Sequence, residues 1–309
     1  MDVMNQYHGK DFSVYLGDSC EVLKGIPDAS VHYSITSIPF ASLYTYSATE
    51  RDLGNCRNHN EFWEHFQFLI KEWVRTIMPG RLISIHCMNL PTSKQNDGFI
   101  GIKDFRGDVI RAMVDAGMIY HSEVCIWKDP VIAMQRTKAL GLLHKQIRKD
   151  SCMSRQGIPD YLVTFRKPGD NTEPVEGLFD HFAGDYDLPM GTDEVKNSIN
   201  IWQRYASPVW MDINPSDTLQ RESAREEKDE RHICPLQLQV IERGLQLWTN
   251  PGDVVLDPFN GIGSSGYRAL QMKRRYIGIE LKESYYEQAV KNLISAEAQG
   301  HQDTLFDLI

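Results

Sequence analysis

The chain has 309 residues, enough for one large α/β domain with an insertion or for two modest domains, and 41% of its residues are hydrophobic. Its six cysteines lack C-x-x-C spacing, which argues against a disulfide scaffold or a zinc site, so we expect no metal and a reduced, cytoplasmic location. The net charge of −9 disfavours a phosphate-bearing partner unless the basic residues are segregated. No signal peptide or membrane span is expected, because no run is apolar and long enough.

The N-terminal part alternates strand and helix patterns. Residues 13–18 are typical of a strand that ends in a Gly-Asp turn, and residues 20–24 of a short helix. Asp18 thus falls at the carboxyl end of a strand, where open α/β sheets bind ligands, although a role as N-cap of the following helix explains the same residue. A second strand, residues 31–36, runs directly into Ser37-Ile38-Pro39-Phe40.

The alternation continues along the first half of the chain. After a polar loop over residues 41–60, apolar residues at helical spacing predict a helix over residues 61–77 that ends at Pro79-Gly80. We further expect a strand, a helix, a strand and a last strand before an insertion at residues 81–86, 104–117, 122–127 and 161–166. This order predicts an α/β fold with a mostly parallel sheet covered on both faces.

The charges of the middle segment are segregated. Residues 128–155 carry seven basic residues against two acids, and residues 168–231 are mainly acidic and lack periodicity. The basic run is suited to contact phosphates, whereas a solvated helix face would also explain it. The acidic stretch fits a surface excursion. The candidate phosphate contacts are Arg136, Lys138, His144, Lys145, Arg148, Lys149 and Arg155.

A ligand-binding corner is predicted near the C-terminus. Residues 254–257 form a β-branched run, which a turn through Gly261 and Gly263 separates from a helix. These glycines let the backbone approach a ligand, and the N-terminus of the helix offers unpaired N–H groups. A further strand ends in Glu280 about 20 residues on, where such folds place a carboxylate that accepts ribose hydroxyls.

The turn Asp257-Pro258-Phe259-Asn260-Gly261-Ile262-Gly263 resembles the cofactor motif of S-adenosylmethionine-dependent DNA amino-methyltransferases. Ser37-Ile38-Pro39-Phe40 resembles their catalytic (Asp/Asn/Ser)-Pro-Pro-(Tyr/Phe) motif, and this order of motifs is that of their β group. The resemblance implies a Rossmann-like methyltransferase sheet with an inserted target-recognition region. It implies a catalytic half at residues 1–130, a DNA-contacting segment with the recognition insertion at 131–230, and a cofactor half with the C-terminal tail at 231–309. It also implies that S-adenosyl-L-methionine is bound by Asp18, Asp257, Phe259, Gly261, Gly263, Ser264, Glu280 and Pro235.

The resemblance implies direct methyl transfer to the exocyclic amine of a flipped base in double-stranded DNA. Because the lone pair of such an amine is delocalised into the ring, the Ser37 hydroxyl and the Ile38 carbonyl are expected to accept the amine hydrogens and localise that pair. Pro39 completes the motif, and Phe40 is expected to stack on the base. Ile38 replaces the family's usual proline, which loosens the backbone and keeps open a catalytically weak, nucleic-acid-binding partner. Ser37 favours cytosine N4 over adenine N6.

Other functions fit parts of the sequence. RNA or a protein amide is an alternative substrate, but the basic segment and the insertion favour DNA. Cytosine C5 methylation is excluded, because it needs a Pro-Cys sequence and the chain has only Cys234-Pro235. After a helix at residues 285–298, the tail resembles extended peptides that dock in the bacterial sliding clamp, through Gln302, Leu305 and Phe306. A homodimer is a further candidate, whereas the recognition sequence and any paired restriction enzyme are not readable.

Overall fold

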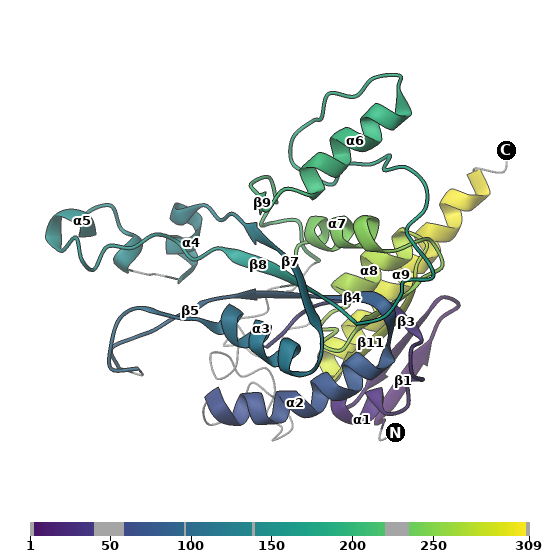
Figure 1. Cartoon of the computed structure of the whole chain (residues 1–309), viewed down its shortest axis with the longest axis horizontal. Coiled ribbons are helices and arrows are strands. Elements are labelled where there is room, and N and C mark those ends of the chain that lie inside the picture. Colours follow the sequence, from purple (N-terminus) through teal and green to yellow (C-terminus); the bar gives the residue numbers. More distant parts are fainter. Residues whose placement is uncertain (1–2, 40–58, 96, 138–139, 220–234, 307–309) are drawn as a thin grey trace.

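The centre of the fold is a mostly parallel β-sheet (Figure 1). This computed structural model describes residues 3–39, 59–95, 97–137, 140–219 and 235–306, and within them the sheet has nine strands. In sheet order these are β1 (Asn5–His8), β2 (Phe12–Leu16), β11 (Arg275–Glu280), β10 (Val254–Asp257), β3 (Val31–Ser37), β4 (Ile77–Met88), β8 (Asp160–Arg166), β7 (Ile119–Ile126) and β9 (Val209–Trp210). The neighbours from β2 to β4 are parallel, and β9 is parallel to β7. Strand β1 is antiparallel to β2, and β8 is antiparallel to both β4 and β7.

Helices cover both faces of this sheet, as the sequence predicts. One buried cluster takes side chains from α1 (Ser19–Leu23), α2 (His59–Thr76) and α3 (Phe105–Asp115). A second cluster, on the opposite face, takes them from α7 (Leu238–Trp248), α8 (Ser264–Gln271) and α9 (Glu283–Phe306). Successive residues of β4 point to opposite clusters, since Ile83 and Ile85 join the first and Leu82 packs against the second. A separate hairpin pairs β5 (Leu90–Pro91) with β6 (Ile102–Lys103).

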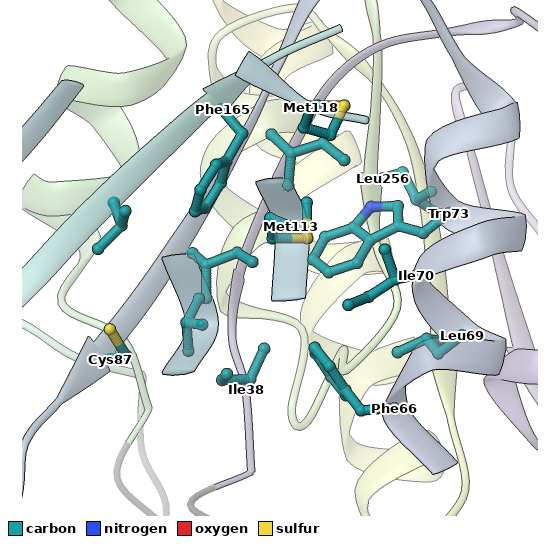
Figure 2. Close-up of a cluster of buried hydrophobic side chains, with 14 of the residues drawn as sticks. Ile38, Phe66, Leu69, Ile70, Trp73, Cys87, Met113, Met118, Phe165 and Leu256 are labelled. Atoms are coloured by element: carbon teal, nitrogen blue, oxygen red, sulfur yellow. The ribbon is translucent and has the colours of Figure 1, made fainter. Parts of the chain in front are cut away.

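Helix α2 forms because its apolar residues recur at helical spacing. Phe66 and Trp73 point into the first cluster (Figure 2), and both are buried. The predicted end of this helix is wrong: it stops before Ile77, which instead begins β4 and pairs with Val31 of β3. Ile77 is fully buried, so pairing within the sheet outweighs one more helical residue, and Pro79-Gly80 lies inside the strand.

Strand β8 separates two long connections. Before it lies the arm, defined as residues 128–159, which contains α4 (Pro130–Thr137), the 3-10 turn η3 (Leu140–Leu142) and α5 (Gln146–Lys149). After it lies the excursion, defined as residues 167–208, which contains α6 (Glu194–Tyr205). Figure 1 shows the arm projecting beyond the end of the sheet and α6 standing apart from it. The part of the chain from the arm to residue 210 thus contributes β8 and β9 to the same sheet as the segments on either side.

A buried arginine fixes the excursion to helix α7. Arg243 Nε donates to the carbonyl oxygen of Ala183 at 2.7 Å, and Nη2 donates to Asp212 Oδ2 at 2.6 Å. The guanidinium carbon lies 4.9 Å from the ring centre of Trp210 and 5.4 Å from that of Tyr205. The cation is therefore paired, hydrogen-bonded and enclosed by aromatic rings, which makes it one anchor of the excursion, beside the pair of His181 with Glu242 of α7.

The sheet reverses its direction of winding between β10 and β3. The chain leaves β10 through α8 and returns on one side as β11, whereas it leaves β3 through α2 and returns on the other side as β4. The carboxyl ends of two parallel strands whose connections diverge in this way flank a crevice in which open α/β sheets bind ligands. Separately, among the described residues, no helix combines the length and apolar character needed to span a bilayer.

Candidate functional site

Asp257 lies at the carboxyl end of β10, on this crevice. Its Oδ1 accepts hydrogen bonds from Thr36 Oγ1 at 2.5 Å and from the backbone N–H of Phe259 at 3.0 Å. Burial raises the pKa of this carboxyl to about 6, and the hydroxyl donors Thr36 and Ser265 lower it only in part. Thr36 directly precedes Ser37, so one hydrogen bond joins the predicted cofactor turn to the strand that carries the predicted catalytic motif.

The glycine turn after Asp257 is held by Glu280. Gly261 and Gly263 adopt left-handed φ angles of 53° and 86°, and Gly263 is the N-cap of α8. The Gly261 N–H donates to Glu280 Oε2 at 2.7 Å, and the Glu280 Oε1 accepts from Leu281 and Lys282. Burial raises the pKa of the Glu280 carboxyl to about 7. The predicted ribose acceptor and the predicted cofactor turn are therefore one hydrogen-bonded unit, followed by Ser264 in the first turn of α8.

The loop after β2 joins the same site. Asp18 is the N-cap of α1, because its Oδ1 accepts from the backbone N–H of Cys20 at 2.8 Å. Ser19 Oγ donates to the carbonyl oxygen of Pro258 at 2.5 Å, and the Gly17 N–H donates to that of Glu280 at 2.9 Å. The ends of β2, β11 and β10 thus lie side by side. Burial and the neighbouring Asp18 raise the pKa of Cys20 to about 12, which keeps this cysteine a thiol.

Ser37 is the last residue of β3, and Ile38 follows it into the core. The Ile38 side chain is 1% exposed and lies in the first cluster near Phe66 (Figure 2). The sequence predicts a looser backbone from the missing proline, but the buried side chain anchors this position by packing. Pro39 is half-buried, and Phe40 lies outside the described residues. Phe259 packs its ring against Phe66, with centroids 6.2 Å apart.

The sequence analysis missed two residues that lie against Ser37. His86, near the end of β4, is the register partner of Ser37, and its Nδ1 lies 3.0 Å from Ser37 Oγ. Asp160 Oδ2, at the start of β8, lies 3.2 Å from the other imidazole nitrogen, and Lys128 Nζ donates to Asp160 Oδ1 at 2.6 Å. The sequence indicates Lys128 only as part of the basic run. The available signal was a histidine and an aspartate at the ends of predicted strands.

The predicted DNA contacts lie on the arm. Four of them, His144, Lys145, Arg148 and Lys149, are exposed, and the last three, called the arm cluster, form no ion pair within the described residues. Arg155 is half-buried and donates to the carbonyl oxygen of Gln156. Lys138 and the side chain of Arg136 lie outside the part of the chain that the structure describes.

The predicted cofactor contact Pro235 and the predicted clamp-binding tail lie in other parts of the fold. Pro235 is half-buried at the entry to α7. At the C-terminus, the expectation of an extended tail is wrong for the backbone, because α9 continues through Gln302 and Leu305 to Phe306. No proline interrupts these residues, so the helix predicted to end at residue 298 propagates further.

Comparison with known proteins gives matches of three kinds. The sequence profile of the DNA methylase family N6_N4_Mtase matches residues 31–291. The type II methyltransferase M.Cfr9I of Citrobacter freundii is 40% identical over 62 residues, which are 20% of this chain and 21% of that protein. The structure of TTHA0409 from Thermus thermophilus, complexed with S-adenosyl-L-methionine, has 22% identity and a TM-score of 0.63 over 92% of this chain and 93% of that one. PvuII DNA methyltransferase (cytosine-N4-specific) has 17% identity and a TM-score of 0.63 over 97% and 96%.

These matches differ in what they establish. The matched segments span only 19% to 28% of the lengths of the curated relatives. The structural similarities, at such low identity, establish the fold and confirm the predicted Rossmann-like methyltransferase sheet. The family profile covers more than half of the chain. The chain therefore belongs to the DNA methylase family.

Proposed function

We propose that this chain is a DNA methyltransferase that transfers a methyl group from S-adenosyl-L-methionine to the exocyclic amine of a flipped base, with cytosine N4 favoured. The observation that carries the proposal is the hydrogen bond between Thr36 Oγ1 and Asp257 Oδ1, 2.5 Å long, at the point where the winding of the sheet reverses. It joins the strand that carries the proposed catalytic motif to the proposed cofactor turn, which supports a single site for both. A methyl donor and an acceptor amine bound there would be adjacent, as direct transfer requires.

The cofactor turn suits a nucleoside with a charged sulfonium. A Cβ added to Gly261 would meet nothing within 4 Å, so there is open space beside the turn. The carboxylates of Asp18 and Glu280 border the turn and offer acceptors for amino and hydroxyl groups. When bound, S-adenosyl-L-methionine supplies an electrophilic methyl group; the chain's task is to hold it and to orient the amine.

The catalytic motif would orient that amine through two acceptors. The Ser37 hydroxyl and the Ile38 carbonyl would accept its two hydrogens, which localises the nitrogen lone pair toward the methyl group. The buried Ile38 side chain favours an active enzyme over a silent partner, because it fixes the backbone that bears this carbonyl. Ser37 in the first position supports cytosine, and adenine N6 is the second candidate.

The arm would contact the DNA backbone. The arm cluster has three exposed cations that form no ion pair within the part of the chain that the structure describes, and it provides local positive charge on a chain whose net charge is −9. Duplex DNA in a bacterial cytoplasm is therefore the proposed substrate, with the acidic excursion as the proposed recognition region. A homodimer and a contact of the tail with the sliding clamp, through Gln302, Leu305 and Phe306, are proposals of lower rank that need their own binding assays.

Nucleoside analysis tests the function. Duplex DNA is incubated with the chain and labelled cofactor, digested, and its nucleosides are identified by mass spectrometry. We expect N4-methylcytosine, and its loss in Ser37→Ala while calorimetry finds unchanged cofactor affinity. Recovery of N6-methyladenine alone would replace cytosine by adenine. Cofactor binding without transfer to any DNA would support the silent partner, and preferential transfer to competing RNA would reject DNA as substrate.

A further inference from the structure

A line of polar contacts leads from Ser37 into the protein. Ser37 Oγ lies 3.0 Å from His86 Nδ1, His86 Nε2 lies 3.2 Å from Asp160 Oδ2, and Asp160 Oδ1 accepts from Lys128 at 2.6 Å. His86 and Asp160 are buried, and Lys128 is partly exposed. The Nε2 atom has no hydrogen bond of good geometry within the described residues, so Asp160 is the acceptor at hand for its N–H.

The charge of Asp160 determines which imidazole nitrogen carries the proton. Burial alone would raise the pKa of Asp160, but Lys128 and then His86 outweigh it, so the pKa of this carboxyl is held below its usual value. An anionic carboxylate beside Nε2 favours a proton on Nε2. Nδ1 is then an unprotonated acceptor, and the hydrogen between Nδ1 and Ser37 belongs to the serine hydroxyl.

We propose that His86, held by Asp160 and Lys128, is a positioning residue that orients the Ser37 hydroxyl and takes up the proton released on methylation. This rests on the function proposed above. With its own hydrogen donated to Nδ1, Ser37 Oγ presents its lone pairs to a hydrogen of the substrate amine. As the amine nitrogen forms the new N–C bond, the pair of the broken C–S bond stays on sulfur. The nitrogen then gives a proton to Ser37 Oγ and keeps the electron pair of that N–H bond. At the same time the original hydroxyl hydrogen of Ser37 passes to His86 Nδ1. The imidazolium so formed later loses a proton to solvent.

The protonation state of His86 is tested first, in the unmodified full-length chain. Protein labelled with 15N-histidine is observed by NMR without cofactor, and the His86 signals are those that disappear in His86→Asn. We expect Nε2 protonated and Nδ1 bare at neutral pH, and Nδ1 protonated in Asp160→Asn, whose amide can donate to Nε2. A wild-type His86 with its proton on Nδ1 would overturn the proposal, whether or not the protein methylates DNA.

Kinetics test the consequence for transfer. We expect His86→Asn and Asp160→Asn each to lower kcat about 10²- to 10³-fold, with KM for the cofactor unchanged. The matched control is Thr164→Val, which removes a buried hydroxyl paired with Ser84 at 2.8 Å on the same two strands, β4 and β8, away from Ser37. It should retain kcat. Full activity in His86→Asn, whose amide oxygen can accept the serine hydrogen but cannot take a proton, would overturn the proton-uptake role. If no variant or wild type methylates any DNA, the proposed function fails, and the NMR result still decides the position of the proton.

Discussion

Replacing Asp257 by asparagine should reveal a stability cost that the proposed cofactor site imposes on the chain. Burial raises the pKa of Asp257 from 3.8 to about 6, so between these values the folded chain binds a proton that the unfolded chain has lost. Stability contributed by this group is therefore present at low pH and is lost as the pH rises through about 6. The difference between the two pKa values corresponds to about 3 kcal/mol at pH 8.

Asparagine has nearly the shape of aspartate but never ionises. Its oxygen can still accept from Thr36 and from the backbone N–H of Phe259, the two donors that Asp257 Oδ1 uses now. Any loss of stability caused by the new amide group is independent of pH. The pH dependence of the difference in unfolding free energy between variant and wild type therefore isolates the contribution of the carboxylate. From pH 4.5 to pH 8 we expect Asp257→Asn to gain about 2 kcal/mol in unfolding free energy relative to wild type.

Urea denaturation without cofactor, at several pH values, measures this difference. The matched control is Asp170→Asn, which makes the same substitution at an exposed aspartate. For Asp257→Asn, a difference in unfolding free energy that does not change with pH would refute the reasoning, and so would a difference that falls as the pH rises. Either result would mean that the carboxylate is compensated in the folded chain by donors additional to Thr36, Ser265 and Phe259.

Three further predictions concern other parts of the chain. Replacing the arm cluster by alanines should make the negative slope of log affinity for DNA against log salt shallower by up to about 2.7, because each lost phosphate contact removes about 0.9. Fluorescence anisotropy measures this slope, and an unchanged slope would exclude the arm cluster as a phosphate contact. Arg243→Met should cost about 3–5 kcal/mol in urea denaturation, since it leaves Asp212 buried without its partner; a cost below about 1 kcal/mol would show that the excursion is anchored otherwise. Iodoacetamide at pH 8 should modify exposed Cys152 and spare Cys87, whose pKa burial raises, as peptide mass mapping would show; equal labelling would contradict this burial.

The parts of the site that sequence could predict are those built from consecutive residues. A strand, a glycine turn and a helix follow one another from residue 254, and Glu280 closes the next strand, so local chemistry indicates the corner. The order of strands and helices also predicts the parallel sheet. The direction of β8 has no such signal, since an apolar strand looks the same whether it pairs parallel or antiparallel. Because Asp160 meets His86 only through that antiparallel pairing, its contact with the site could not be read from the sequence.

Strand β8 lies between the proposed DNA-contacting arm and the proposed catalytic motif. Lys128 is the first residue of the arm, and Asp160, the first residue of β8, follows its last residue. The ion pair between them therefore closes the base of the connection that carries the arm cluster. The same Asp160 lies against His86, which lies against Ser37. The proposed phosphate-binding arm is thus joined to Ser37, the proposed catalytic serine, through the side chains of Lys128, Asp160 and His86. A contact between the two proposed sites gives a reason for a lysine and an aspartate at a strand end where apolar residues would pack as well.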